Sequence, residues 1–236
     1  MSRIWTISHN GFLKYVSLTP YHLQDALNIM RNCFFKEESV SRAIGLNKSP
    51  EAIRELDELV LDILEDGVSV IAVEEKTGKV AGSLLNKIIT KEDSPDGYFK
   101  KFNFKHPLAK KYDEINVAID NSLNGFELFK SNCYFESVYV TALPEFRNKE
   151  VALKLLQSSL KVAQCLKDGE DVRISVNSNE LPPLIKPTGV LGIATTIASE
   201  KIMIKEEFVT GKVVDLKNTL TTVPLSPITI MYKFLK

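Results

Sequence analysis

The chain has 236 residues, of which 44% are hydrophobic and 25% charged, and its 30 basic and 30 acidic residues give a formal net charge of zero. A chain of this size buries a substantial core without metals or disulfides, and we expect one domain over residues 1–236. The charge balance argues against nucleic-acid and membrane surfaces, so we expect neither partner and a monomer or weak dimer.

The opening residues contain no apolar run of signal-peptide length, and no later stretch is long enough to span a bilayer. We therefore expect a cytoplasmic protein. Its three cysteines, Cys33, Cys133 and Cys165, are widely spaced, as is usual for reduced thiols in that compartment. No pair of cysteines or histidines has the spacing of metal ligands, so we expect no metal.

The first half of the chain predicts a strand at residues 12–18 and a helix that begins at Thr19-Pro20 and ends near Phe35. A second helix is predicted over residues 50–64, with one apolar face. Apolar segments at residues 68–73 and 79–85 flank a glycine-containing loop and predict a hairpin.

The second half predicts a polar surface loop at residues 91–112 and a helix over residues 115–129. A strand around Val138 and a helix from Val151 follow, and then an irregular segment over residues 167–188. The remaining predicted elements are a buried strand at 189–195, a helix at 197–205, and strands at 208–214 and 228–234.

The strand, turn and helix of residues 135–156 contain the most specific motif. A strand that enters a helix N-terminus exposes unpaired backbone N–H groups, which suit a pyrophosphate. The segment resembles the acetyl-CoA loop of the GNAT acetyltransferases, Arg/Gln-x-x-Gly-x-Gly/Ala, with Arg147 and Ala152 in place and Glu150 where the family has glycine. The resemblance implies acetyl-CoA as co-substrate, held by Val138, Tyr139, Val140, Arg147, Asn148, Lys149, Glu150, Val151 and Ala152.

The order of the predicted elements, β-α-α-β-β-(α)-β-α-β-α-β-β, is that of the GNAT fold. This is an α/β fold with a twisted mixed sheet and helices on both faces. The short apolar runs around Val138 and Leu191 predict two neighbouring strands at the centre of the sheet, and the resemblance implies that these strands splay apart.

An acidic pair follows the first long helix. The segment Cys33-Phe34-Phe35-Lys36-Glu37-Glu38-Ser39 resembles the Phe-Phe-x-Asp-Glu-Pro signature of the insect and nematode arylalkylamine N-acetyltransferases, with serine in place of the proline. The resemblance places Glu38 at the general base. A carboxylate there takes the proton that an ammonium must lose before it attacks a thioester, and burial raises its pKa. Two solvated acids at a helix end are the alternative.

Two hydroxyl residues, Thr195 and Ser199, stand four apart before Lys205 and Phe208, as in the family's strand-to-helix segment. They could relay a proton to the leaving thiolate or orient the acceptor. Hydroxyls at a helix start are also ordinary caps. Glu207 again stands where the family has glycine.

These residues predict an N-acetyltransferase that acts on a small arylalkylamine such as dopamine, serotonin or tyramine. A polyamine or a protein N-terminus is an alternative acceptor. A GNAT fold kept as a weak or inactive binding module is an alternative of another class, favoured by Ser39, Glu150 and Glu207. The sequence also predicts that Glu150 opposes the pyrophosphate, and that glycine there would cost the helix start some stability.

Overall fold

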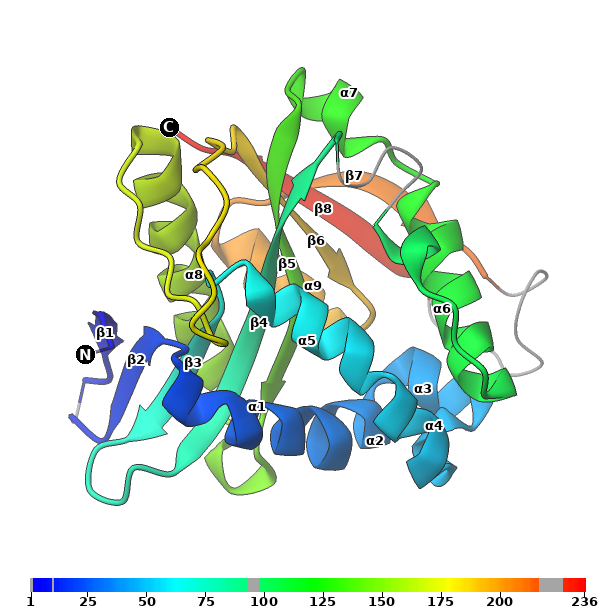
Figure 1. Ribbon diagram of the computed structural model, residues 1–236, viewed down its shortest axis with the longest axis horizontal. Helices are drawn as coiled ribbons and strands as arrows, with labels where there is room; N and C mark the ends of the chain where they lie inside the picture. The colour runs from blue at the N-terminus through cyan, green and yellow to red at the C-terminus, as the bar shows by residue number, and fades with distance from the viewer. Residues whose placement is uncertain (1, 10, 93–97, 217–226) are drawn as a thin grey trace.

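A mixed sheet of eight strands runs through the molecule (Figure 1). The computed structural model describes residues 2–9, 11–92, 98–216 and 227–236. The strands, in order across the sheet, are β1 (Ile4–Ile7), β2 (Leu13–Ser17), β3 (Val70–Glu74), β4 (Val80–Thr90), β5 (Cys133–Ala142), β6 (Gly189–Ala194), β8 (Ile228–Phe234) and β7 (Val209–Val214). The pairs are antiparallel apart from β5 and β6, which are parallel. The predicted interior position of the strand around Val138, beside the strand around Leu191, is confirmed.

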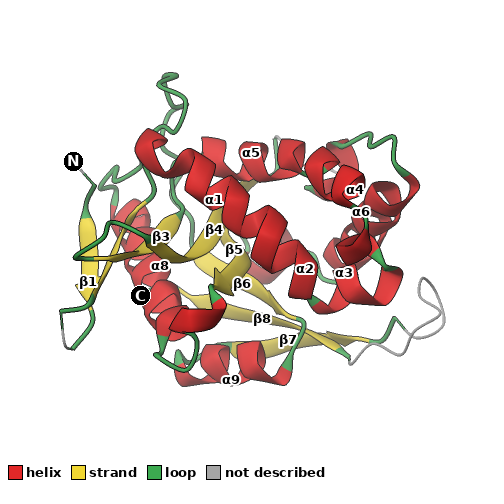
Figure 2. Ribbon diagram, turned by 90° about the horizontal axis from the view of Figure 1, so that it is seen from below, coloured by secondary structure: helices red, strands yellow, loops and turns green. Residues whose placement is uncertain are grey.

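Helices cover both faces of the sheet (Figure 2). One face carries η1 (Pro20–His22), α1 (Leu23–Ile29), η2 (Met30–Phe34), α2 (Phe35–Glu37), α3 (Ser39–Ile44), η3 (Leu46–Lys48), α4 (Pro50–Glu55), α5 (Asp57–Glu65), η4 (Phe99–Lys101) and α6 (Pro107–Asp120). The other face carries α8 (Val151–Asp168) and α9 (Ile197–Lys205). Two short elements, α7 (Gly125–Phe129) and η5 (Pro144–Phe146), come before and after β5 in the chain.

Each face of the sheet has its own apolar core. On α5, Leu59, Val60 and Ile63 are fully buried and pack against the sheet, as their i, i+1, i+4 spacing predicts. On α8, Leu155 and Leu166 are fully buried in the second core on the opposite face. No helix within the described ranges is both long and apolar enough to cross a membrane.

The helix predicted over residues 115–129 is wrong in its bounds. Its first part, α6, begins earlier at Pro107, and the ring of His106 accepts a hydrogen bond from the Leu108 N–H at 3.1 Å. Its second part is the separate helix α7, whose N-cap is Asn124. An asparagine side chain that accepts N–H groups starts a new helix better than it continues an old one, so the chain turns there.

The sequence prediction missed a strand and a helix in the N-terminal part of the chain. The strand β1 has four residues, too few for a periodicity signal, and pairs with β2. The helix α3 starts directly after the acidic pair, with Glu38 as its N-cap. Between α1 and α2 the predicted continuous helix contains the π-helical turn η2, a feature frequent at functional sites.

Candidate active site

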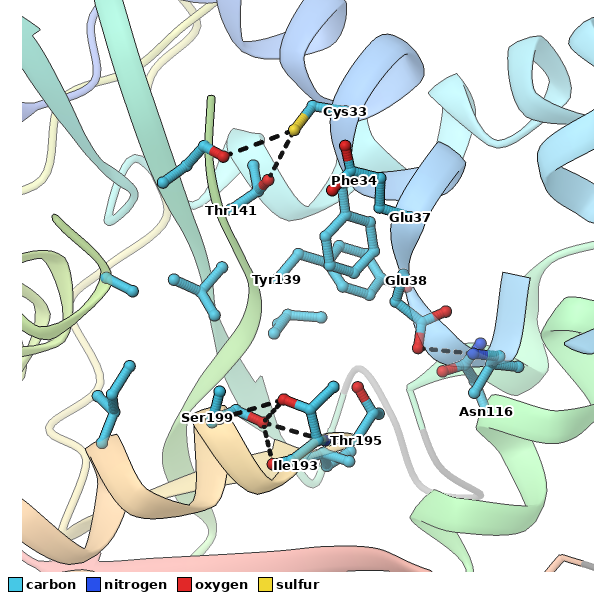
Figure 3. Close-up of a pocket in the computed structure, with 18 of the residues that line it drawn as sticks. Cys33, Phe34, Glu37, Glu38, Asn116, Tyr139, Thr141, Ile193, Thr195 and Ser199 are labelled. Carbon is cyan, nitrogen blue, oxygen red and sulfur yellow. Dashed lines mark hydrogen bonds between the residues drawn. The ribbon is translucent and has the colours of Figure 1, made fainter. Parts of the chain in front are cut away.

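A cavity of about 330 Å³ opens beside the central strands (Figure 3). Its apolar walls include the rings of Phe34, Phe99, Tyr112 and Tyr139. The polar residues that line it are Glu37, Glu38, Asn116, Thr141, Arg147, Thr195, Thr196 and Ser199. A mostly apolar cleft with a few convergent polar groups is the usual form of a small-molecule site.

The cavity exists because β5 and β6 diverge. Their parallel pairing runs from Phe135 with Val190 to Ser137 with Gly192. Beyond that point β5 stays paired with β4 up to Ala142, while β6 stays paired with β8. The edge of β5 that faces β6 is therefore open to a ligand from Val138 onward.

A β-bulge lies at the same level of β5. Leu85 of β4 pairs with Tyr139 and Asn86 pairs with Ser137, so Val138 is the extra residue. A bulge bends a strand and re-aims its side chains. Here the Tyr139 ring packs against Phe34 with centroids 4.7 Å apart, while Val138 and Val140 line the space between the strands.

The first turn of α8 meets the cavity at Ala152. The first backbone hydrogen bond into the helix runs from the Lys154 N–H to the Glu150 carbonyl oxygen at 2.9 Å, so the N–H groups of residues 151–153 have no intrahelical partner. The Glu150 side chain does not cap them. These N–H groups and the helix dipole favour an anion at this end.

Two cations of the preceding loop already have partners. The exposed Arg147 forms an ion pair with Glu37, and its Nε donates to the Ala142 carbonyl oxygen at 3.1 Å. The Lys149 Nζ lies 5.4 Å from the centroid of the Phe146 ring. A phosphate on the α8 N-terminus would compete with the carboxylate of Glu37 for Arg147.

The carboxylate of Glu38 is held in a fixed position at the wall of the cavity. Its two oxygens accept hydrogen bonds from the Val40 and Ser41 N–H groups, both at 2.8 Å. Burial raises the pKa of Glu38, and hydrogen bonding from those N–H groups and from the Thr195 hydroxyl limits that rise. The carboxylate is neither exposed on the surface nor without hydrogen-bond donors. It is a fixed carboxylate that faces a pocket.

No family model matches the sequence, and no curated protein matches it. The structure, however, resembles known enzymes over nearly its whole length. It matches arylalkylamine N-acetyltransferase 2 from Aedes aegypti with a TM-score of 0.75 at 20% identity, over 95% of this chain and 99% of that one. It matches mosquito arylalkylamine N-acetyltransferase like 5b with a TM-score of 0.75 at 16% identity, over 94% and 100% of the two chains. It also matches a polyamine N-acetyltransferase of Drosophila melanogaster that forms N-acetylagmatine, with a TM-score of 0.70 at 11% identity, over 94% and 100%.

The chain has the GNAT fold. The predicted fold class is thereby confirmed, together with the divergence of the two central strands that the resemblance implied.

The two glutamates that stand at glycine positions of the GNAT motifs both have a left-handed backbone conformation. Glu150 has φ 57° and Glu207 has φ 63°, and Asn148 in the same loop has φ 59°. A left-handed conformation costs a residue with a Cβ on the order of 1–2 kcal/mol, except asparagine, which tolerates it. The reason given for a stability cost of glycine at position 150 does not hold, because Glu150 is the N-cap and not part of the helix.

The two predicted hydroxyls have different surroundings. Ser199 completes a capping box with Thr196: its hydroxyl donates to the Thr196 carbonyl oxygen at 2.8 Å and accepts from the Thr196 N–H at 3.2 Å. Its single proton is thus already donated. Thr195 precedes the cap and faces Glu38. Both residues line the cavity.

The other predicted residues of the acetyl-CoA loop are arranged around the helix start rather than in the cavity. Val151 is buried in the core, and the side chains of Asn148, Lys149 and Glu150 are exposed. Ligand contact from this loop would therefore come from backbone N–H groups, from Arg147 and from Ala152. Pyrophosphate fits the backbone here, and Glu150 is the one acidic side chain of residues 147–152.

Several lining residues were not predicted as site residues. Cys33 lies 3.4 Å from the Thr141 hydroxyl and 3.4 Å from the Arg147 Nη2, and Tyr112 and Asn116 come from α6. Cys33 and Phe34 are adjacent to the acidic motif and could have been suspected from it. No pattern in the sequence links α6 to the site. Among the described residues, no group of three or more histidine, cysteine, aspartate and glutamate side chains could hold a metal.

Proposed function

We propose that this protein is an acetyl-CoA-dependent N-acetyltransferase that acetylates the amine of a small arylalkylamine such as dopamine, serotonin or tyramine. The observation that carries the proposal is the placement of the Glu38 carboxylate. It is fixed by two backbone N–H groups, faces an aromatic cavity and lies beside the open edge of β5.

The acceptor amine would enter between α6 and the segment that carries Glu38. Its aromatic ring would pack among Phe34, Tyr112 and Tyr139, and Glu38 would take a proton from its ammonium directly or through water. The raised pKa brings the Glu38 carboxylate closer to the working pH of such a base. The neutral amine then attacks the acetyl carbon of the thioester.

Acetyl-CoA would bind along the open edge of β5, with its pyrophosphate on the α8 N-terminus and near Arg147. An N–H group of the strand around Val138 would meet the thioester oxygen and stabilise the charge that develops on it. Thr195 would help hold Glu38 and the acceptor in place. We give Ser199 the lesser role, because its proton already serves the helix cap.

A polyamine acceptor is the alternative within the same chemistry, since the Drosophila protein of this fold acts on such a substrate. The aromatic walls support the arylalkylamine instead: of the two carboxylates that line the cavity, Glu38 would serve as the base and Glu37 is paired with Arg147, which leaves rings for the rest of the acceptor. A binding module without catalysis is the alternative of another class. It is favoured by Glu150 at the anion-binding helix end and by the ion pair that occupies Arg147.

An assay of thiol release from acetyl-CoA over a panel of arylalkylamines and polyamines tests the proposal. Turnover with the aromatic amines supports it, whereas turnover with polyamines alone would assign the other acceptor. Thermal unfolding with and without acetyl-CoA separates the non-catalytic module, because a ligand at 100 times its Kd adds about 2.7 kcal/mol of stability. Stabilisation without turnover on any amine would favour the module.

A further inference from the structure

One wall of the cavity is a single face of α6. Tyr112, Asn116 and Ile119 line it, and their i, i+4, i+7 spacing puts them on one side of the helix. Glu38 and Asn116 face the same cavity (Figure 3). Burial raises the pKa of Tyr112, and the neighbouring Tyr139 and Glu38 add to the rise. Glu38 therefore lies toward the Tyr112 end of this wall.

Phe99 stands at the other end of the α6 wall. Asp120, the residue after Ile119 and the last of α6, accepts hydrogen bonds from the backbone N–H groups of Tyr98 and Phe99. This contact holds η4 against the last turn of α6. The Phe99 side chain is 1% exposed and lines the cavity. Ile119 and Phe99 together form an apolar end wall.

A second carboxylate holds the same segment from the side of α5. The Oδ2 of Asp62 accepts a hydrogen bond from the Tyr98 hydroxyl at 2.6 Å, and its Oδ1 accepts one from the Lys101 Nζ, also at 2.6 Å. The Phe99 ring packs edge to face on Tyr98, with centroids 5.1 Å apart. Hydrogen bonds to a charged group are the stronger kind. Carboxylates on two helices thus fix the position of Phe99.

The rings nearer to Glu38 are fixed as well. Phe35 is fully buried and packs edge to face on Tyr112, with centroids 5.7 Å apart, and on Tyr139, with centroids 6.0 Å apart. Rings packed in this way do not adapt to a ligand as an unbranched methionine does. The size of the acceptor that fits is therefore set by side chains that stay in place.

The length of the α6 wall limits the acceptor, on the basis of the proposed function. With the amine at Glu38, the aromatic ring extends along α6 toward Ile119. From Asn116 to Ile119 the helix rises about 4.5 Å, which leaves room for one ring before Phe99. We propose that Phe99 is a specificity-determining residue, which limits the acceptor to phenylalkylamines such as tyramine and dopamine and disfavours the longer indolylalkylamines. Asp120 is the positioning residue that holds Phe99 in place.

The expected discrimination follows from overpacking. An indole carries one fused ring more than a phenyl group. Against a fixed wall, the added atoms must displace buried side chains. One methylene group in an apolar pocket is worth about 10- to 200-fold in kcat/KM, so the fused ring should cost at least about tenfold.

The test compares kcat/KM for acetyl transfer to phenylethylamine and to tryptamine, which differ in the ring system alone. The parent protein should prefer phenylethylamine by about tenfold or more. Phe99→Leu shortens the end wall and should raise the tryptamine-to-phenylethylamine ratio about tenfold. Phe104→Leu removes a ring that is buried to a similar degree but lies outside the lining, so that ratio should not change.

Asp120→Asn tests the positioning role and does not depend on the folding of Phe99→Leu. Asparagine keeps an oxygen for the N–H groups of η4 and loses the charge, so the segment is held less firmly. The tryptamine-to-phenylethylamine ratio should rise by a few fold, while kcat with phenylethylamine stays close to that of the parent. Asp113→Asn makes the same change on α6, outside the lining, and should leave the ratio unchanged.

Two results would overturn this inference alone. One is a parent protein that acetylates tryptamine as well as phenylethylamine. The other is a ratio that stays at the parent value in both Phe99→Leu and Asp120→Asn, because the end wall would then not select the acceptor. Failure of every amine with acetyl-CoA would instead overturn the proposed function itself.

Discussion

The two sides of the cavity differ in how well their residues suit the proposed acetyl transfer. On the acceptor side, Glu38 has ordinary backbone angles, two hydrogen bonds to N–H groups and a pKa raised by burial. On the side of the α8 N-terminus, Glu150 has a left-handed conformation and an exposed charge, and Arg147 is paired with Glu37. The acceptor side therefore has the chemistry that acetyl transfer needs. At the α8 N-terminus, the free backbone N–H groups suit an anion, whereas the acidic side chain of Glu150 does not.

The comparison indicates which step limits the proposed enzyme. Glu150 and Glu207, which stand at glycine positions of the GNAT motifs, both have a left-handed backbone, which is a strained conformation for a residue with a side chain. Donor binding, rather than proton removal, should then be the weak step. The predictions below test each side separately, from the largest expected effect to the smallest.

The largest effect should come from the acceptor side. Glu38→Gln keeps an oxygen for the helix N-cap and removes the proton acceptor, so turnover should fall by about two to four decades. In the parent protein, turnover should rise with pH through the raised pKa of Glu38, because only the carboxylate accepts a proton. This rise of turnover with pH should be absent in Glu38→Gln. Unchanged turnover between about pH 6 and pH 9 would rule out Glu38 as the base.

The pH dependence of stability should trace to two carboxyls outside the cavity lining, Glu136 on β5 and Asp120 at the end of α6. Burial raises the pKa of Glu136 and of Asp120, and the charge of Asp120 adds to the rise at Glu136, while that of Asp113 adds to the rise at Asp120. The folded state then binds more protons than the unfolded state, so the free energy of unfolding should fall as pH rises through the raised pKa values. Each unit of upward shift costs about 1.4 kcal/mol above the folded pKa.

Urea unfolding of Glu136→Gln at several pH values checks this dependence. The variant should show a shallower fall with pH, whatever its absolute stability. Glu170→Gln is the control, because Glu170 is exposed and its pKa is lowered by Arg3. Its slope above pH 5 should match that of the parent, with pH 5 chosen as about the upper end of ordinary carboxyl titration. Equal slopes in all three proteins would contradict the protonated buried pair.

Much of this arrangement could be predicted from the sequence, because local signals carry it. Apolar runs predicted the strands β5 and β6, and the resemblance of the Phe-Phe motif implied that Glu38 lies at the site. The different surroundings of Thr195 and Ser199 could not be predicted. The sequence did not show that Thr196 is the N-cap of α9 and that the Ser199 hydroxyl pairs with it. Nor could Asn116 and Tyr112, which reach the cavity only through the packing of α6. The positive φ angles of Glu150 and Glu207 could not be predicted either, because glutamate disfavours a left-handed backbone.

On the α8 side, removal of the left-handed glutamates should stabilise the apo protein. Glu150→Gly and Glu207→Gly should each add about 1 kcal/mol, which is about 2–4 °C in Tm for a chain of this size. Lys154→Gly in the body of α8 is the control and should lower stability by about 1 kcal/mol. A loss of stability in both left-handed variants would show that these positions are unstrained.

The smallest effect should be that of Ser199→Ala. Loss of the capping box should cost about 1 kcal/mol in thermal unfolding, with turnover changed by only a few fold. Thr195→Val should show the reverse, with turnover lowered about tenfold and little change in stability. If Ser199→Ala instead lowers turnover by decades, its hydroxyl is part of the proton path and the cap is secondary.

Titration calorimetry of acetyl-CoA into the parent protein and into Glu150→Gly tests the central claim most directly. The account predicts binding in both, with the variant tighter by about an order of magnitude, because an exposed like charge near a phosphate weakens binding only modestly. Lys149→Gly is the matched control and should not tighten binding. The absence of acetyl-CoA binding in both the parent and Glu150→Gly would contradict the account and leave the non-catalytic module as the better description.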